Sequence, residues 1–239
     1  MKSQKNGCLI ALIVAVLVPI VFLIFFKYLD TNRQTLETDK CLPIYGNKLP
    51  KETTNSKGDV VIDTIYHTIP KFSFINQNGD SINQDIMKNK VVVADFFFTS
   101  CPTICIDMTN NLHIIQEEYF NDKDVLILSH TVDPETDSVG QLKKYAIEKD
   151  VNSKVWHLLT GNKKDLYAIA RNGYLVTAVQ GDGGSNDFIH SEKLVLIDKE
   201  KRIRGFYDGT KLESIEKLKK DIQLLLVSYI VPMKEEKKD

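Results

Sequence analysis

A continuous apolar segment near the middle of the chain constrains the fold most. Its eight residues, VVVADFFF at 91–98, are almost all apolar, and most are β-branched or aromatic. Such a run is typical of a strand that is buried on both faces, because a strand with one solvated face would alternate apolar and polar residues. We therefore predict a central strand with other elements packed against both of its faces.

Helical and strand patterns alternate after this segment. Apolar residues recur at Met108, Leu112, Ile115 and Tyr119, a three- and four-residue spacing that predicts a helix with one buried stripe. The same patterns predict strands at 125–129, 155–159 and 174–179, and helices at about 138–149 and 163–172. This alternation predicts an α/β sheet with helices on both faces.

Two hairpins flank these elements. Asn78-Gly79 lies between apolar residues, and this dipeptide readily adopts the positive backbone angles of a tight turn, so residues 70–83 are expected to form a hairpin. A second hairpin is expected from Leu194–Ile197 and Ile203–Tyr207, which a charged turn joins. A final amphipathic helix should follow it and end before the tail.

The N-terminal region contains nineteen uncharged residues, CLIALIVAVLVPIVFLIFF, at 8–26. This length suffices to cross a hydrocarbon core of about 30 Å. Lys27 and the residues after it do not resemble a signal-peptide cleavage site, so we expect an uncleaved transmembrane helix. With the short head at 1–7 in the cytoplasm, the remainder would lie outside it, as a single-pass protein of a bacterial inner (cytoplasmic) membrane.

The remaining boundaries follow from composition. Residues 27–58 are polar and interrupted by prolines and glycines, which predicts an irregular tether. The folded domain is expected at 59–231, and a charged tail at 232–239. A formal net charge of -1, from 31 basic and 32 acidic residues, provides no field that would attract nucleic acid, so we expect no nucleic-acid partner.

Two cysteines, Cys101 and Cys105, follow the buried strand in the sequence TSCPTIC. Pro102 suits the first position of a helix, so Cys101 should lie at a helix N-terminus, where partial positive charge favours the thiolate. A spacing of four residues puts both sulfurs on one helix face, with Cα atoms roughly 6 Å apart. The pair can close reversibly as a disulfide or stay open as two metal ligands. Cys8 and Cys41 lie in the expected span and tether.

A third ligand is needed, because two thiolates alone complete none of the soft-metal sites formed by Cu(I), zinc or iron-sulfur centres. His113 is about 12 Å from the cysteines along the same helix, too far to join them. His67 precedes the core fold, and His157 lies inside an apolar strand. His130 ends the strand beside the central one, and could reach the site or merely line it. We select His190, because it closes a glycine-rich loop at the sheet edge where ligand sites gather.

Four segments in order, TSCPTIC, TVDPETD, DFIHSEKLVLID and RGFYDG, resemble the SCO/SenC family of copper chaperones over about residues 65–230. The resemblance implies a thioredoxin-like fold, a central mixed sheet flanked by helices, held by one N-terminal span. It implies that Cys101, Cys105 and His190 bind copper, as Cu(I) or Cu(II). It further implies delivery of copper to the binuclear copper site of cytochrome c oxidase, or reduction of the cysteines of that site. The partner would be the copper-bearing subunit or another copper protein.

The sequence departs from the family pattern in two places. Ile106 stands where relatives usually have proline, which could loosen the helix start without touching a ligand. His190 lacks an acidic immediate neighbour, although ligating imidazoles normally have a hydrogen-bond acceptor. Asp187 or Asp133 could provide one. Asp133 also fits ordinary turn and helix-capping chemistry together with Pro134 and Asp137, so both roles stay open.

We expect a copper chaperone and not an enzyme, and two other interpretations compete with this one. A thiol-disulfide oxidoreductase or thiol peroxidase would use Cys101 as nucleophile and Cys105 as resolving thiol. Such proteins usually place a cis-proline opposite the cysteines, and this chain has no proline between Pro134 and Pro232. An inert structural disulfide would close too small a loop to stabilise much.

Overall fold

The computed structural model describes residues 18–19, 21–22, 42–54, 58–101, 104–176 and 191–230. The chain divides into two compact units, and the larger one, Cys41–Pro232, contains every strand described below. The predicted transmembrane helix at 8–26 lies largely outside the described residues. Within the ranges given above, no helix combines the length and apolar character needed to cross a membrane.

A seven-stranded mixed sheet forms the centre of this unit, in the order β4-β3-β7-β6-β5-β8-β9. β5 pairs in parallel with β6, and β6 with β7, whereas the other neighbours are antiparallel. Every residue of β5 is buried, so the predicted central strand is confirmed. The strands are β3 (Ser73–Asn76), β4 (Ser81–Asn83), β5 (Val91–Phe97), β6 (Val125–Thr131), β7 (Trp156–Thr160), β8 (Lys193–Ile197) and β9 (Ile203–Asp208).

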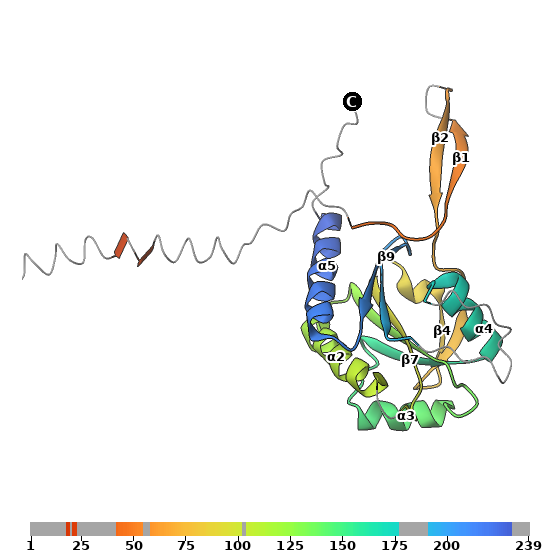
Figure 1. Ribbon diagram of the computed structural model, residues 1–239, viewed down its shortest axis with the longest axis vertical. Helices are drawn as coiled ribbons and strands as arrows, with labels where there is room; N and C mark the ends of the chain where they lie inside the picture. The colour runs from red at the N-terminus through yellow and green to blue at the C-terminus, as the bar shows by residue number, and fades with distance from the viewer. Residues whose placement is uncertain are drawn as a thin grey trace, which may run out of the picture. The chain divides into compact units, whose positions relative to one another are not determined.

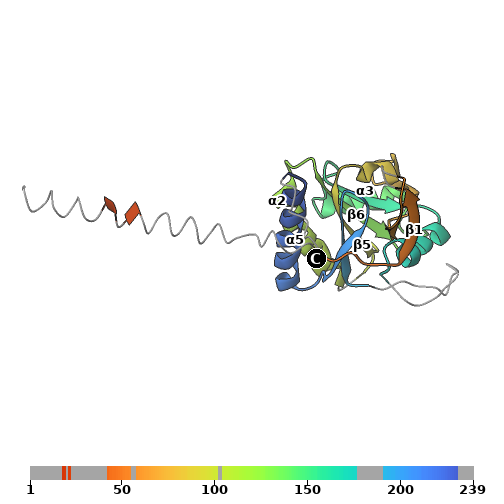
Figure 2. The same ribbon diagram turned by 90° about the horizontal axis from the view of Figure 1, so that it is seen from above.

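Helices cover both faces of the sheet, as predicted. One face carries α2 (Ile104–Tyr119), α3 (Val139–Glu148) and α5 (Leu212–Ile230). The other carries α4 (Lys163–Ala168), the π-helical turn η2 (Ile169–Gly173) and the 3-10 helix η1 (Gln84–Met87). α2 and α5 lie side by side, and Lys219 of α5 pairs with Glu118 of α2 at 3.0 Å (Figures 1 and 2).

The pleat of the central strands divides the core into two halves. Apolar residues at odd positions of β5 and β6 pack toward α2, α3 and α5, and this half also contains both cysteines. Apolar residues at even positions pack toward α4. Successive side chains of a strand point to opposite faces, so the position of a residue in β5 or β6 decides which half it enters.

The predicted hairpin at 70–83 is confirmed by the antiparallel pairing of β3 with β4. Gly79 in its turn has a φ of 87°, a left-handed conformation that favours glycine. The side-chain oxygen of Asn76 accepts hydrogen bonds from the backbone N–H groups of Asn78 and Asp80, both at 2.9 Å. The turn is therefore fixed by an asparagine side chain as well as by the glycine.

The strand predicted at 174–179 is wrong for residues 174–176, which belong to no strand, and its remainder lies outside the described residues. Helical structure continues through η2, and the N–H of Tyr174 donates to the carbonyl oxygen of Ile169 at 2.8 Å. Leu175 then adopts a φ of 56°. Tyr174 and Val176 are buried in the core, so their apolar character reflects packing without strand pairing.

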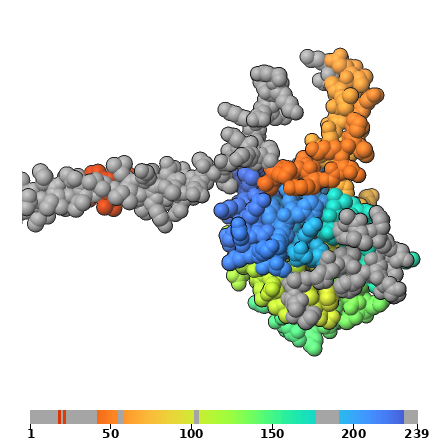
Figure 3. All heavy atoms as spheres, in the orientation of Figure 1, coloured from red at the N-terminus to blue at the C-terminus, as the bar shows by residue number. Residues whose placement is uncertain are grey.

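The irregular structure predicted for residues 27–58 is wrong at its C-terminal end. β1 (Lys48–Thr54) pairs antiparallel with β2 (Val60–Tyr66) in a separate two-stranded ribbon. The ribbon projects from the rest of this unit (Figures 1 and 3). Two of its apolar side chains, Val60 and Ile62, are 69% and 76% exposed. The sequence of β1, KLPKETT, is mostly polar and resembles a linker, and for this reason the pattern did not predict a strand there.

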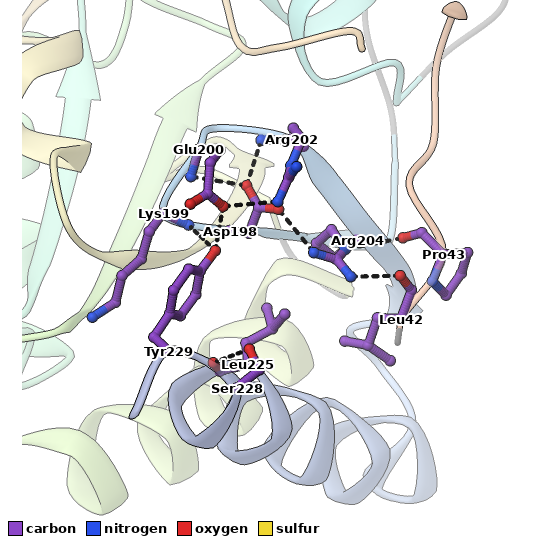
Figure 4. A network of polar contacts seen from close by, with 10 residues as sticks. All are labelled: Leu42, Pro43, Asp198, Lys199, Glu200, Arg202, Arg204, Leu225, Ser228 and Tyr229. Atoms are coloured by element: carbon purple, nitrogen blue, oxygen red, sulfur yellow. Dashed lines mark hydrogen bonds and ion pairs between the residues drawn. The ribbon is translucent and has the colours of Figure 1, made fainter. Parts of the chain in front are cut away.

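An ionic cluster between β8 and β9 holds the start of the described domain. The carboxylate of Asp198 is fully buried and accepts from Arg202 at 2.7 Å and Arg204 at 2.9 Å. Arg204 also donates to the backbone carbonyl oxygens of Leu42 at 2.5 Å and Pro43 at 3.2 Å (Figure 4). One buried guanidinium therefore ties the segment that precedes the ribbon to the sheet.

Replacement of Asp198 by alanine should lower the free energy of unfolding by about 3–5 kcal/mol, because it leaves the buried guanidinium of Arg204 without its anionic partner. Urea denaturation measures this change. The control is Lys144→Ala, which removes an exposed pair with Glu148 at 3.9 Å and should cost less than about 1 kcal/mol. Equal losses in the free energy of unfolding from the two substitutions would contradict a stabilising role for the buried Asp198–Arg204 pair.

Candidate metal and dithiol site

The two cysteines lie where β5 gives way to α2, as predicted. β5 ends at Phe97, residues 98–101 form the connection, here called the cysteine loop, and α2 begins at Ile104. Cys101 and Cys105 are 7% and 5% exposed, and no disulfide joins them in the described structure. The N–H of Cys101 donates to the carbonyl oxygen of Phe98 at 3.3 Å, which closes the loop on itself. The pair is therefore nearly buried at the carboxyl edge of the central strand.

The two sulfur atoms have different surroundings. The backbone N–H of Cys105 donates to Sγ of Cys101 at 3.5 Å. Burial raises the pKa of Cys105, and a hydrogen bond with the side chain of Cys101 raises it further. A backbone donor favours negative charge on the sulfur that it contacts, whereas burial favours the protonated thiol. These surroundings agree with the prediction that Cys101 is the more acidic thiol of the two.

A fully buried carboxylate binds the cysteine loop. Asp137 accepts hydrogen bonds from the backbone N–H of Thr99 at 3.1 Å, from Oγ1 of Thr99 at 2.5 Å and from Oγ1 of Thr131 at 2.5 Å. Thr99 lies in the cysteine loop, and Thr131 ends β6. From the sequence, Asp137 was expected only to take part in turn and helix-capping chemistry. The available signal was the presence of threonines at the carboxyl ends of two adjacent strands, with an acid shortly after.

A second buried carboxyl group lies on the cysteine side of the sheet. Asp95 occupies an odd position of β5 and is 2% exposed. It accepts a hydrogen bond from Oγ of Ser129, which in turn accepts from Nε1 of Trp156 at 2.7 Å. Burial raises the pKa of Asp95 from 3.8 to about 7, against a smaller lowering by the bond from Ser129. The charge of Asp95 also raises the pKa of Cys105.

His130 lies on the opposite face of the sheet from the cysteines. It occupies an even position of β6, is fully buried, and packs in the α4 half of the core. The rings of Phe96 and Tyr174 both lie 5.1 Å from its ring, centroid to centroid, and the rings of Phe72 and Phe74 lie at 6.1 and 5.7 Å. Neither ring nitrogen has a hydrogen-bond partner of good geometry in the described structure. The structure therefore assigns His130 to the core and does not bring it to the cysteines.

Burial of His130 disfavours its charged form. The pKa of this histidine is lowered from 6.5 to about 4, because desolvation outweighs the opposing effect of backbone groups of Asp95 and Leu128. The imidazole is therefore neutral at neutral pH.

The other described histidines also lie away from the cysteine pair. Nε2 of His67 is 2.7 Å from the carbonyl oxygen of Gly173, and Nδ1 of His157 is 3.2 Å from the side chain of Asn76. His113 packs edge-on against Trp156. Over the residues that the structure describes, no three metal-binding side chains come together. His190 and Asp187 lie outside the described residues.

The remaining positions singled out from the sequence have ordinary local roles. The N–H of Asp133 donates to Oγ1 of Thr131 at 3.0 Å, and its carbonyl oxygen accepts from the N–H of Asp137 at 2.8 Å, which is turn chemistry. The cap of α3 is Ser138, which accepts from Gln141 at 3.3 Å. Ile106 lies in the first turn of α2 and is 38% exposed. The helix therefore forms at this position although the proline usual in relatives is absent.

Comparisons with known proteins identify a family and solved structures that are similar to this chain. The SCO1/SenC family model matches residues 63–226. The crystal structure of a SCO1/SenC family lipoprotein from Bacillus anthracis is 30% identical and covers 67% of this chain and 95% of that one, with a TM-score of 0.59.

Two further solved structures are similar. BsSco, a member of the Sco family of cytochrome c oxidase assembly proteins in which a disulfide switch was identified, is 28% identical; the match covers 66% of this chain and 93% of that one, with a TM-score of 0.57. Arabidopsis thaliana ScoI with copper bound is 25% identical, covers 67% of this chain and 99% of that one, and has a TM-score of 0.53.

Replacement of His130 by leucine should make the domain more resistant to acid. The folded pKa of about 4 is below the ordinary 6.5, so stability due to neutral His130 is present above pH 6.5 and is lost as the pH falls toward 4. The loss in wild type amounts to about 3 kcal/mol. Urea denaturation at pH 7 and pH 4.5 measures it. If the free energy of unfolding of the variant fell by the same amount between pH 7 and pH 4.5, the conclusion that His130 is buried and neutral would be wrong.

Replacement of Asp95 by asparagine should have the opposite pH dependence. The folded pKa of about 7 is above 3.8, so stability due to protonated Asp95 is present at low pH and is lost as the pH rises through 7. Relative to wild type, the variant should gain about 3 kcal/mol between pH 5 and pH 8. The same denaturation series tests this. A stability difference between the two proteins that does not change with pH would show that Asp95 is ionised throughout.

Proposed function

This chain belongs to the SCO1/SenC family, and on that premise we propose that it is a membrane-anchored, extracytoplasmic copper-binding protein that serves the assembly of cytochrome c oxidase. The observation that carries the proposal is the pair of reduced, nearly buried cysteines on one helix start, at the carboxyl edge of a central strand. The similar protein BsSco is a member of the Sco family of cytochrome c oxidase assembly proteins, and the similar Arabidopsis ScoI has copper bound.

The donor set that we propose is Cys101, Cys105 and His190. Two thiolates and a neutral imidazole are soft and borderline donors that suit Cu(I), and an added oxygen ligand would suit Cu(II). His190 precedes Lys193, the first residue of β8, by three residues, a distance of at most about 10 Å. β8 is antiparallel to β5, so it begins at the sheet edge where β5 ends in the cysteine loop. This topology supports His190 over His130, whose ring faces the other half of the core.

Copper transfer would proceed through ligand exchange. Thiolates of a recipient protein would replace the donors of this site one at a time, so that the ion is never free. A recipient with two cysteines at its copper site, such as the copper-bearing subunit of the oxidase, has the required chemistry. The expected span at 8–26 would keep the domain near a membrane-bound recipient.

Reduction of the recipient's cysteines is a second candidate activity, supported by the reduced state of the Cys101 and Cys105 pair. The Cys101 thiolate would attack the recipient's disulfide, and one of the two recipient sulfurs would leave as a thiolate. Cys105 would then attack the mixed disulfide, which releases the second recipient sulfur. The recipient gains two electrons, and this chain ends with a Cys101–Cys105 disulfide.

The ligand set is tested by titrating Cu(I) into the full chain and its His190→Ala variant. Loss of one of three donors should weaken binding at least tenfold and alter the copper absorption spectrum. His113→Ala is the matched control, because that imidazole packs against Trp156 and should leave both measurements unchanged. Unchanged affinity and spectrum in His190→Ala would exclude His190 as a ligand.

The two activities are separated by measuring copper content beside the number of free thiols. About one equivalent of copper with both thiols protected from alkylation supports copper binding and delivery. No copper affinity, together with rapid cycling of the dithiol against a disulfide substrate, would reject the copper proposal in favour of the reductase.

A further inference from the structure

Asp137 is an unusual residue for a protein core because its carboxylate has no cationic partner among the described residues. It is fully buried, and no lysine or arginine of the described ranges forms an ion pair with it. A buried carboxylate is tolerated only when it is paired or fully hydrogen-bonded. Its donors are the N–H and hydroxyl of Thr99 and the hydroxyl of Thr131. The charge therefore depends on two threonines, and one of them is two residues from Cys101.

These donors come from the ends of both central strands. Thr131 pairs with Phe97 in the parallel ladder of β6 and β5, and the N–H of Val132 donates to the carbonyl oxygen of Phe97 at 2.8 Å. Thr99 follows β5 directly. Asp137 therefore joins the cysteine loop to the neighbouring strand at the place where the ladder ends.

Asp137 is itself held by the start of α3. Its N–H donates to the carbonyl oxygen of Asp133 at 2.8 Å, and Ser138, the next residue, caps that helix. Gln141 of α3 reaches back and donates to Oγ1 of Thr99 at 3.2 Å. The hydroxyl of Thr99 thus donates to Asp137 and accepts from Gln141, so both of its hydrogen-bonding directions are used. Thr99 has little freedom to move relative to α3.

We propose that Asp137 is the positioning residue of the cysteine pair, which through Thr99 fixes the place of Cys101 relative to Cys105. The loop is attached by packing at Phe98, by the bonds of Thr99, and by the N–H bond of Cys101. The bonds of Thr99 to Asp137 and Gln141 tie the loop to α3 and to the segment that leads into it. Asp137 bonds both the backbone N–H and the hydroxyl of Thr99, whereas Gln141 bonds the hydroxyl alone, so Asp137 contributes most to this attachment.

The expected consequence is a loss of preorganisation. Both metal binding and disulfide closure require the Cys101 sulfur to stay within reach of its partner atoms, and a misplacement of about 1 Å is costly at such sites. The inference rests on the proposed function where it takes copper affinity as a readout. Disulfide closure gives a readout that does not depend on copper.

The test compares Asp137→Asn with Asp198→Asn in the full chain. The two substitutions make the same chemical change at fully buried aspartates, and Asp198 lies in the β8–β9 turn with its own arginine partners. Each reduced protein is mixed with oxidised glutathione, which takes up two electrons as the Cys101–Cys105 disulfide forms and two glutathione thiols are released. Asp137→Asn should slow closure at least tenfold and weaken Cu(I) binding at least tenfold. Asp198→Asn should lower the urea midpoint and change neither.

Thr99→Val keeps the proposal testable if Asp137→Asn does not fold, because it removes only the hydroxyl and retains the backbone bond. It should slow closure and weaken Cu(I) binding severalfold in a protein with a normal urea transition. Wild-type closure rates and copper affinity in Asp137→Asn, or in Thr99→Val where the first variant does not fold, would overturn the proposal. Absence of copper binding in wild type would refute the proposed function and leave the closure rates to decide the role of Asp137.

Discussion

The parallel pairing of β5 with β6 is the constraint on which the rest of this domain depends. Both strands are buried along all seven residues, and their register aligns Phe97 with Thr131 at the carboxyl edge. Everything reactive in the described structure starts from that edge: the cysteine loop leaves β5 there, and the segment with Asp137 leaves β6. Because parallel strands end at the same edge, two segments about thirty residues apart in sequence are brought into hydrogen-bonding distance.

The pleat of the same strands separates the polar groups of the core. Asp95 and Ser129, at odd positions, face the layer that holds the cysteines, whereas His130, at an even position, enters an aromatic cluster beneath α4. Adjacent residues of one strand therefore have different relations to the thiols. Ser129, which bonds Asp95, lies on the cysteine side of the sheet, whereas His130 lies on the other side. The sheet keeps the only imidazole of β5 and β6 away from the two sulfurs, so the third donor of the proposed copper site would come from elsewhere in the chain.

Much of this fold could be predicted from the sequence, and the exceptions have physical reasons. β5 was evident because a short apolar run rich in β-branched and aromatic residues is typical of a strand covered on both faces, and the turn at Gly79 followed from local backbone chemistry. Residues 174–176 were assigned wrongly, because apolar residues that pack after a helix have the same composition as a short strand. The place of His130 in the sequence did not reveal which face of the sheet its side chain lies on, since both faces of its strand are apolar. Asp137 escaped notice because an acid after Asp-Pro is equally suited to a turn, and its partners are brought to it only by tertiary pairing.

The ribbon of β1 and β2 exposes apolar side chains beside unpaired backbone groups, a combination that in other proteins recruits further strands and leads to aggregation. Several residues of this ribbon oppose such pairing. Pro50 offers no N–H to either edge, and charged residues, among them Lys51 and Asp63, interrupt the apolar positions of both strands. These features oppose the addition of a further strand to either edge, although Val60 and Ile62 are exposed to water.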